Sequence, residues 1–132
     1  MPDFNLLAVL IAAVSSFIIG GIWYSPLLFD KAWQREAGMT EERLQGRNMA
    51  LIFSAAFGLN FLAALVFALF LGRNPGLVFG VSAGFAAGLF WVAGSLGVIY
   101  LFERRSLKLW LINGGYMIVT FTVIGAILGV FP

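Results

Sequence analysis

The chain has 132 residues, of which 61% are hydrophobic and only 11% are charged, with a formal net charge of +2. Soluble domains are roughly half apolar and about a quarter charged, so this composition indicates an integral membrane protein. The absence of cysteine and histidine excludes thiol nucleophiles, disulfides, imidazole bases and the common transition-metal ligands. We therefore expect no metal and no cofactor, and the small net charge offers no extended basic face for a nucleic-acid partner.

The first apolar segment covers residues 4–24 and carries no charge. At a rise of about 1.5 Å per residue it can cross a hydrocarbon core of roughly 30 Å. A secretory signal requires a basic stretch before its apolar segment, and no Lys or Arg precedes this one. We therefore expect a retained span. Ala8, Ala12, Ser16 and Gly20 repeat every four residues along this segment and predict a stripe that faces protein.

A short amphipathic helix is predicted over residues 26–37, directly after the first span. Ser25 and Pro26 are typical of an N-cap followed by the first helical position, and Gly38 is typical of a helix end. Apolar and charged residues fall on opposite faces, so the helix is expected to lie in the headgroup plane. In the polar connector that follows, Thr40 is placed to cap a short turn.

Three more uncharged runs predict spans over residues 49–71, 77–102 and 109–131. The turn between the second and third spans is short, so we expect these two to be antiparallel neighbours. The predicted fold class is an all-α membrane protein: four transmembrane helices in an antiparallel bundle, plus one short amphipathic interfacial helix. We expect residues 1–132 to form a single four-span domain.

Glycines at a strict spacing of four dominate the start of the third span, and two more with the same spacing lie near the end of the fourth. Glycine is costly within an exposed helix, so such a ladder is expected where another backbone comes close. The stripe on the first span is one possible partner for it. Because small-residue stripes occur on all four spans, more than one tight bundle needs, we also expect a homo-oligomer. The helix-packing candidates are Gly76, Gly80, Gly84, Gly88, Gly125 and Gly129.

Counting from the span ends places a polar layer near the middle of the bilayer, made of Asn60, Trp91, Thr120, Ser15 and Ser16. An unpaired amide or indole N–H in hydrocarbon costs several kcal/mol, so we expect these groups to point inward, with Trp91 donating to Asn60 directly or through one water. The layer is either a pocket for a polar solute or lipid, or a set of interhelical hydrogen bonds, which we favour. No Asp, Glu, Lys or Arg lies inside these spans, so one protomer lacks the groups for a proton relay.

Seven of the eight Lys and Arg residues fall in the first and third connections and one in the second. The positive-inside rule then predicts cytoplasmic first and third loops and both termini outside. Five of these cations are candidates for binding anionic lipid headgroups, although they can also be read as topology signals alone. An enzyme acting on a headgroup would depend on Asp30, Glu36 or Glu103, and we assign no catalytic residue. The headgroup-binding candidates are Lys31, Arg35, Arg104, Arg105 and Lys108.

Two segments carry a family resemblance: Trp-Tyr-Ser-Pro at residues 23–26, and Leu-Lys-Leu-Trp-Leu-Ile-Asn at residues 107–113, which continues to Gly115 and Tyr116. Together with their surroundings they resemble the bacterial membrane family called domain of unknown function 1761, over nearly the whole chain. The resemblance implies a small integral membrane protein of the bacterial inner membrane, with several spans and no assigned activity. Met117 stands where members of that family often carry a histidine.

Three functional hypotheses follow. The leading one is a homo-oligomeric protein with a structural or lipid-associated role, whose partners are membrane lipids and further copies of itself. The alternative is a channel or transporter for a small solute, formed at an oligomer axis, because four helices alone pack around their side chains. The third is an enzyme that acts on a lipid headgroup.

Overall fold

The computed structural model describes residues 4–132, and within them the regular secondary structure is entirely helical. Four rods are long and apolar enough to cross a membrane. They are α1 (Leu6–Trp23), α4 (Met49–Leu71), a continuous rod built from α5 (Leu77–Ala86), the π-helix η1 (Ala87–Ala93) and α6 (Gly94–Phe102), and α7 (Leu107–Val130). The predicted fold class, an all-α four-span membrane protein, is confirmed.

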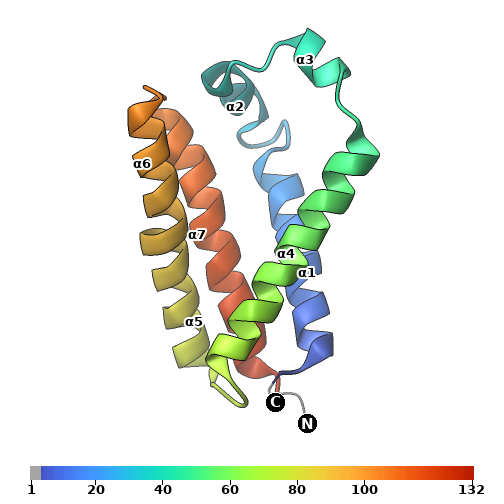
Figure 1. Ribbon diagram of the computed structural model, residues 1–132, viewed down its shortest axis with the longest axis vertical. Helices are drawn as coiled ribbons and strands as arrows, with labels where there is room; N and C mark the ends of the chain where they lie inside the picture. Colours follow the sequence, from blue (N-terminus) through green and yellow to red (C-terminus); the bar gives the residue numbers. More distant parts are fainter. Residues whose placement is uncertain (1–3) are drawn as a thin grey trace.

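Successive rods run in opposite directions, so the molecule has two distinct ends (Figure 1). The start of α1, the end of α7 and the turn between α4 and α5 lie at one end, which we call the terminal end. The short helices α2 (Asp30–Ala37) and α3 (Glu41–Gln45), and the turn before α7, lie at the other, which we call the α2 end. Side-chain caps start three of the rods: Asn5, Asn48 and Ser106 each accept a backbone N–H three residues further on.

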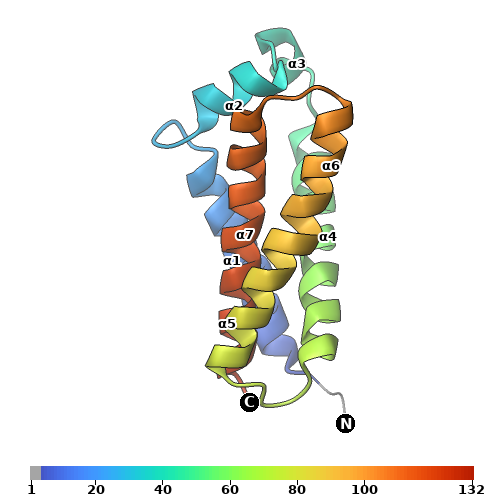
Figure 2. The ribbon, with the colours of Figure 1, turned by 90° about the vertical axis from the view of Figure 1, so that its left-hand side faces the viewer.

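The helix α2 begins four residues later than predicted, at Asp30 rather than at residue 26. Ser25 is no N-cap, because its hydroxyl donates back to the carbonyl of Ile22 and the residues after it form a tight turn, closed by a hydrogen bond from Phe29 N to Trp23 O. The end at Gly38, in the left-handed conformation, agrees with the prediction, as does the Thr40 cap of α3. Figure 2 shows α2 lying across the start of α7.

The glycine ladder of α5 packs against α7, and this is the most extensive helix pair in the molecule. A Cβ at Gly84 would overlap the carbonyl oxygen of Phe121, and one at Gly88 would lie 2.9 Å from the Cα of Ile118. Ala8, Ala12 and Ser16 of the stripe on α1 are buried as expected, but the ladder meets α7 and not α1. Gly76 precedes the helix with φ +88°, and a Cβ on Gly129 would lie 2.6 Å from its carbonyl oxygen.

The helix α4 leans away from the third rod toward the α2 end (Figure 1). Residues 49–55 of α4 are all exposed, whereas its buried residues, Ala64, Phe67, Ala68 and Leu71, lie in the half nearer the terminal end. Along most of its length α4 packs on α1, where Phe17 stacks on Phe57 with ring centroids 5.5 Å apart. The expectation that spans two and three are neighbours therefore holds only near their connecting turn.

Candidate functional site

Part of the predicted midplane layer gathers around the hydroxyl of Tyr116 on α7. This hydroxyl donates to the backbone carbonyl of Ser16 at 3.3 Å, and the side chains of Asn60 and Thr120 interact with it. Ser16 and Thr120 are buried, and Thr120 Oγ1 has no hydrogen-bond partner of normal geometry among residues 4–132. The hydroxyls of Ser15 and Ser16 both donate to Ala12 O on their own helix, at 2.6 and 3.1 Å, so α1 contributes to the layer only the backbone carbonyl of Ser16.

The prediction that Trp91 belongs to this layer is wrong. Its residue surface is 69% exposed, on the outer side of η1, so it cannot contact Asn60. The reason is the lean of α4, which packs on α1 and leaves η1 packed mainly on α7. Equal depth in the membrane was therefore not enough to make the two residues neighbours.

A second polar network lies nearer the α2 end and joins three helical rods. Tyr24, at the end of α1, donates its hydroxyl to Asn113 Oδ1 at 2.6 Å. Asn113 on α7 donates in turn from Nδ2 to the hydroxyl of Tyr100 on α6, at 2.8 Å. A single amide thus uses its acceptor toward one rod and its donor toward another, which fixes the spacing of α1 and α6 about α7.

Two indole rings tie the same region to backbone carbonyls. Trp23 Nε1–H donates to Ile112 O at 2.8 Å, and Trp110 Nε1–H donates to Ala93 O, at the end of η1, also at 2.8 Å. Glycines make room for both rings: a Cβ on Gly115 would lie 3.0 Å from the ring of Trp23, and one on Gly97 would lie 3.0 Å from Nε1 of Trp110. The packing of these two tryptophans therefore favours glycine at both positions.

The amphipathic helix α2 is fastened to the start of α7. Ser106 donates its hydroxyl to Glu36 Oε1 at 2.6 Å while it caps α7, and Arg105 reaches Ala37 O at 3.5 Å. The hydrogen bond from Ser106 lowers the pKa of Glu36 below its usual value, and Arg35 and Lys108 act in the same direction. Trp33 packs edge-on against Tyr24, with ring centroids 5.8 Å apart, so α2 also covers the amide network.

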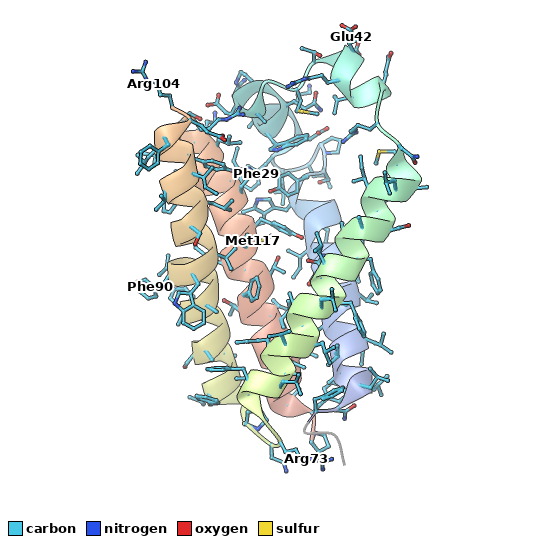
Figure 3. The ribbon with its side chains drawn as sticks, viewed as in Figure 1. Phe29, Glu42, Arg73, Phe90, Arg104 and Met117 are labelled. Atoms are coloured by element: carbon cyan, nitrogen blue, oxygen red, sulfur yellow. The ribbon has the colours of Figure 1, made fainter. Side chains whose placement is uncertain are left out.

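All five headgroup-binding candidates lie at the α2 end with exposed side chains. Figure 3 shows Arg104 at the outer corner of this end, pointing away from the bundle. Arg35 pairs with Glu36 at 3.5 Å and Arg105 with Glu103 at 3.2 Å. Within residues 4–132, no carboxylate lies within 4.0 Å of Lys31, Arg104 or Lys108.

The three carboxylates that a headgroup enzyme would need are already engaged. Asp30 accepts from Gln34 at 2.8 Å, Glu36 from Ser106, and Glu103 from Arg105. No group of three or more acidic, histidine or cysteine residues in the described part of the chain is arranged to hold a metal ion.

Reasoning from the sequence missed Tyr24, Asn113, Tyr100 and Tyr116 as network members. The available signal was the concentration of aromatic and amide groups in the Trp-Tyr-Ser-Pro and Asn-Gly-Gly-Tyr segments. The midplane criterion passed over Tyr24, Asn113 and Tyr100 because their network lies nearer the membrane surface.

Four apolar rods, joined by polar connections and held together by backbone contact and buried amide and tyrosine groups, define an integral membrane protein of the α-helical class. The chain belongs to the family described as Protein of unknown function (DUF1761), whose model matches residues 7–129. This confirms the resemblance noted from its motifs. No curated protein and no solved structure matches the chain with significance.

Proposed function

We propose that this protein is a lipid-associated structural protein of the bacterial inner membrane that binds anionic headgroups at its α2 end. The observation that carries the proposal is the set of exposed cations there, three of which form no ion pair within 4.0 Å of a carboxylate of the described residues. Each Lys or Arg near an anionic membrane surface contributes about 1 kcal/mol of attraction.

The fastening of α2 supports the same proposal. The Glu36–Ser106 hydrogen bond fixes α2 across the start of α7, so Lys31 and Lys108 are carried on elements that are held together. A headgroup bound there would meet cations whose spacing is set before binding, which reduces the entropy lost on association. The charge distribution of seven Lys and Arg at the α2 end against one at the terminal end supports a cytoplasmic α2 end.

Lipid retention tests this proposal. The protein is purified gently from membranes containing phosphatidylglycerol and phosphatidylethanolamine, and the bound lipid is quantified by mass spectrometry. We expect the anionic lipid to be enriched on the unmodified protein. The variant that combines Lys31→Gln, Arg104→Gln and Lys108→Gln is expected to retain less of this lipid, by a factor of about ten or more. The matched control, Arg43→Gln with Arg47→Gln, removes cations from the same end but from the α3 connection. Equal loss in both variants would overturn the proposal.

The competing hypothesis of a channel or transporter is tested on the same protein in sealed liposomes. No Asp, Glu, Lys or Arg lies deeper than the first turn of any of the four spans, and the buried Ser16 and Thr120 are packed among helices. We therefore expect no flux of ions or small polar solutes above that of protein-free liposomes. Flux that scales with protein content would favour the channel.

A further inference from the structure

The outer face of η1 presents a large aromatic surface in the middle of the third span. Phe90 and Trp91 are 70% and 69% exposed, and Figure 3 shows Phe90 projecting away from the rest of the bundle. Trp91 lies fourteen residues after Leu77 and eleven before Phe102, at about 1.5 Å per residue. Its indole is therefore deep in the hydrocarbon, far from the carbonyl esters at either surface.

Trp91 is unlike the two tryptophans that pack within the bundle. Trp23 and Trp110 both donate their indole N–H to backbone carbonyls, whereas Trp91 Nε1 has no acceptor among the described residues. Hydrocarbon chains offer no acceptor, and an unpaired N–H is strongly disfavoured there. The face that carries Trp91 is therefore complementary to a surface that supplies an oxygen at the middle of the membrane.

A second copy of the same chain supplies such an oxygen. Ser95 lies on the same exposed face, one turn from Trp91, and its hydroxyl donates to the backbone carbonyl of Trp91, which leaves the hydroxyl oxygen free to accept. Two copies that share one orientation in a membrane are related by an axis along its normal, so the faces meet at equal depth. The small exposed residues Ser82 and Ala86 on the same rod permit close approach.

We propose that the outer face of η1 and α6 is the interface between two copies of this chain, in which Trp91 of each donates its indole N–H to Ser95 of the other. The inner face of the same rod is occupied by α7, with Ala87, Gly88 and Ala93 buried against it. The interface therefore uses the one side of the rod that the protomer leaves open. The proposal assigns a contact surface to the homo-oligomer that the sequence led us to expect. It does not depend on lipid binding at the α2 end.

Single cysteines test the interface cleanly, because the chain has no cysteine of its own. Val98→Cys places a thiol on the proposed face, 55% exposed, and Leu59→Cys places one on the outer face of α4, 70% exposed. In liposomes at high lipid-to-protein ratio we expect oxidative cross-linking of Val98→Cys and little of Leu59→Cys. Stronger cross-linking through Leu59→Cys, or none above random collision at either site, would overturn the proposal.

The hydrogen bond is tested separately by Trp91→Phe and by Ser95→Ala, measured as dimer dissociation on lipid dilution, with energy transfer between labelled copies. We expect each variant to dissociate about tenfold more readily, since it removes two symmetric contacts. Val66→Ala, on the outer face of α4, is the control for a changed lipid-exposed side chain. Unchanged dissociation for both test variants would overturn the assigned contact. Anionic lipid retention is measured on the same samples, so failure of the interface and failure of the headgroup proposal are distinguishable.

Discussion

Gly80 and Gly125 face each other so closely across the contact between α5 and α7 that a Cβ on either residue would overlap the carbonyl oxygen of the other. The contact is reciprocal and purely backbone in character. Lipid tails are as apolar as the side chains of a helix, so the hydrophobic effect does not drive helices together inside a membrane. Close backbone packing is one of the few interactions that stabilise helix pairs there.

Gly80→Ala is expected to destabilise the protein by about 1–3 kcal/mol, because the helices must separate to admit the methyl group. Gly58 on α4 is the matched control, since a Cβ there meets nothing within 4 Å. Gly58→Ala is expected to be neutral, or to stabilise by about 0.5–1 kcal/mol through helix propensity. Free energies of unfolding in mixed micelles measure both, and a similar cost at both sites would contradict the packing account.

Gly84→Leu is expected to be far worse than Gly76→Leu, for different physical reasons. At Gly84 any Cβ meets the carbonyl of Phe121, and a leucine adds three further carbons to that overlap. At Gly76 a Cβ meets nothing within 4 Å, so the cost is the positive φ of +88°, about 1–2 kcal/mol. The yield of folded protein after detergent extraction measures the difference, and equal yields would place the ladder against lipid.

Asn113→Leu is expected to destabilise by about 1–3 kcal/mol, because it leaves the hydroxyl of Tyr24 without its acceptor. Adding Tyr24→Phe removes the orphaned hydroxyl and is expected to recover part of that loss. A double-mutant cycle built from unfolding free energies gives the coupling. A coupling energy indistinguishable from zero would show that the amide network does not join α1 to α7.

Asn60→Leu and Trp91→Phe are expected to have additive effects, within about 0.5 kcal/mol, because the two residues lie on rods that do not pack together at this level. Asn60→Leu with Tyr116→Phe is expected to be non-additive, since these side chains interact. A measurable coupling energy between Asn60 and Trp91 would contradict this placement. It would support the original expectation that the two side chains contact each other because they lie at the same depth.

Glu36 is expected to titrate below the ordinary range of a glutamate when followed by carboxyl NMR, because Ser106 donates to its ionised form. Since the pKa is lowered on folding, the interaction stabilises the docked α2 above the ordinary pKa of glutamate and is lost as pH falls through the lowered value. Ser106→Ala should raise the pKa of Glu36 toward its ordinary range. No response to that substitution would contradict the fastening of α2.

The orientation is tested by accessibility in intact cells. Cysteines at Gln45 and Glu103, both exposed at the α2 end, are expected to be shielded from an impermeant thiol reagent, while one at Asn74 is labelled. The reverse pattern would invert the topology and move the headgroup-binding candidates to the outer leaflet.

The sequence by itself determined the class and the four spans, because these depend on the length of apolar runs. It also determined the end of α2 at Gly38 and the start of α3 at Thr40, because helix caps are local. The glycine ladder and the Asn-Gly-Gly-Tyr segment were also visible as patterns. Only the tertiary structure decided which helix each pattern meets. Depth along a span is fixed by counting residues, but the direction in which a side chain points depends on the rotation and tilt of every rod. The lean of α4 put Asn60 beside Tyr116 and left Trp91 facing outward, because α4 packs extensively on α1 and little on η1.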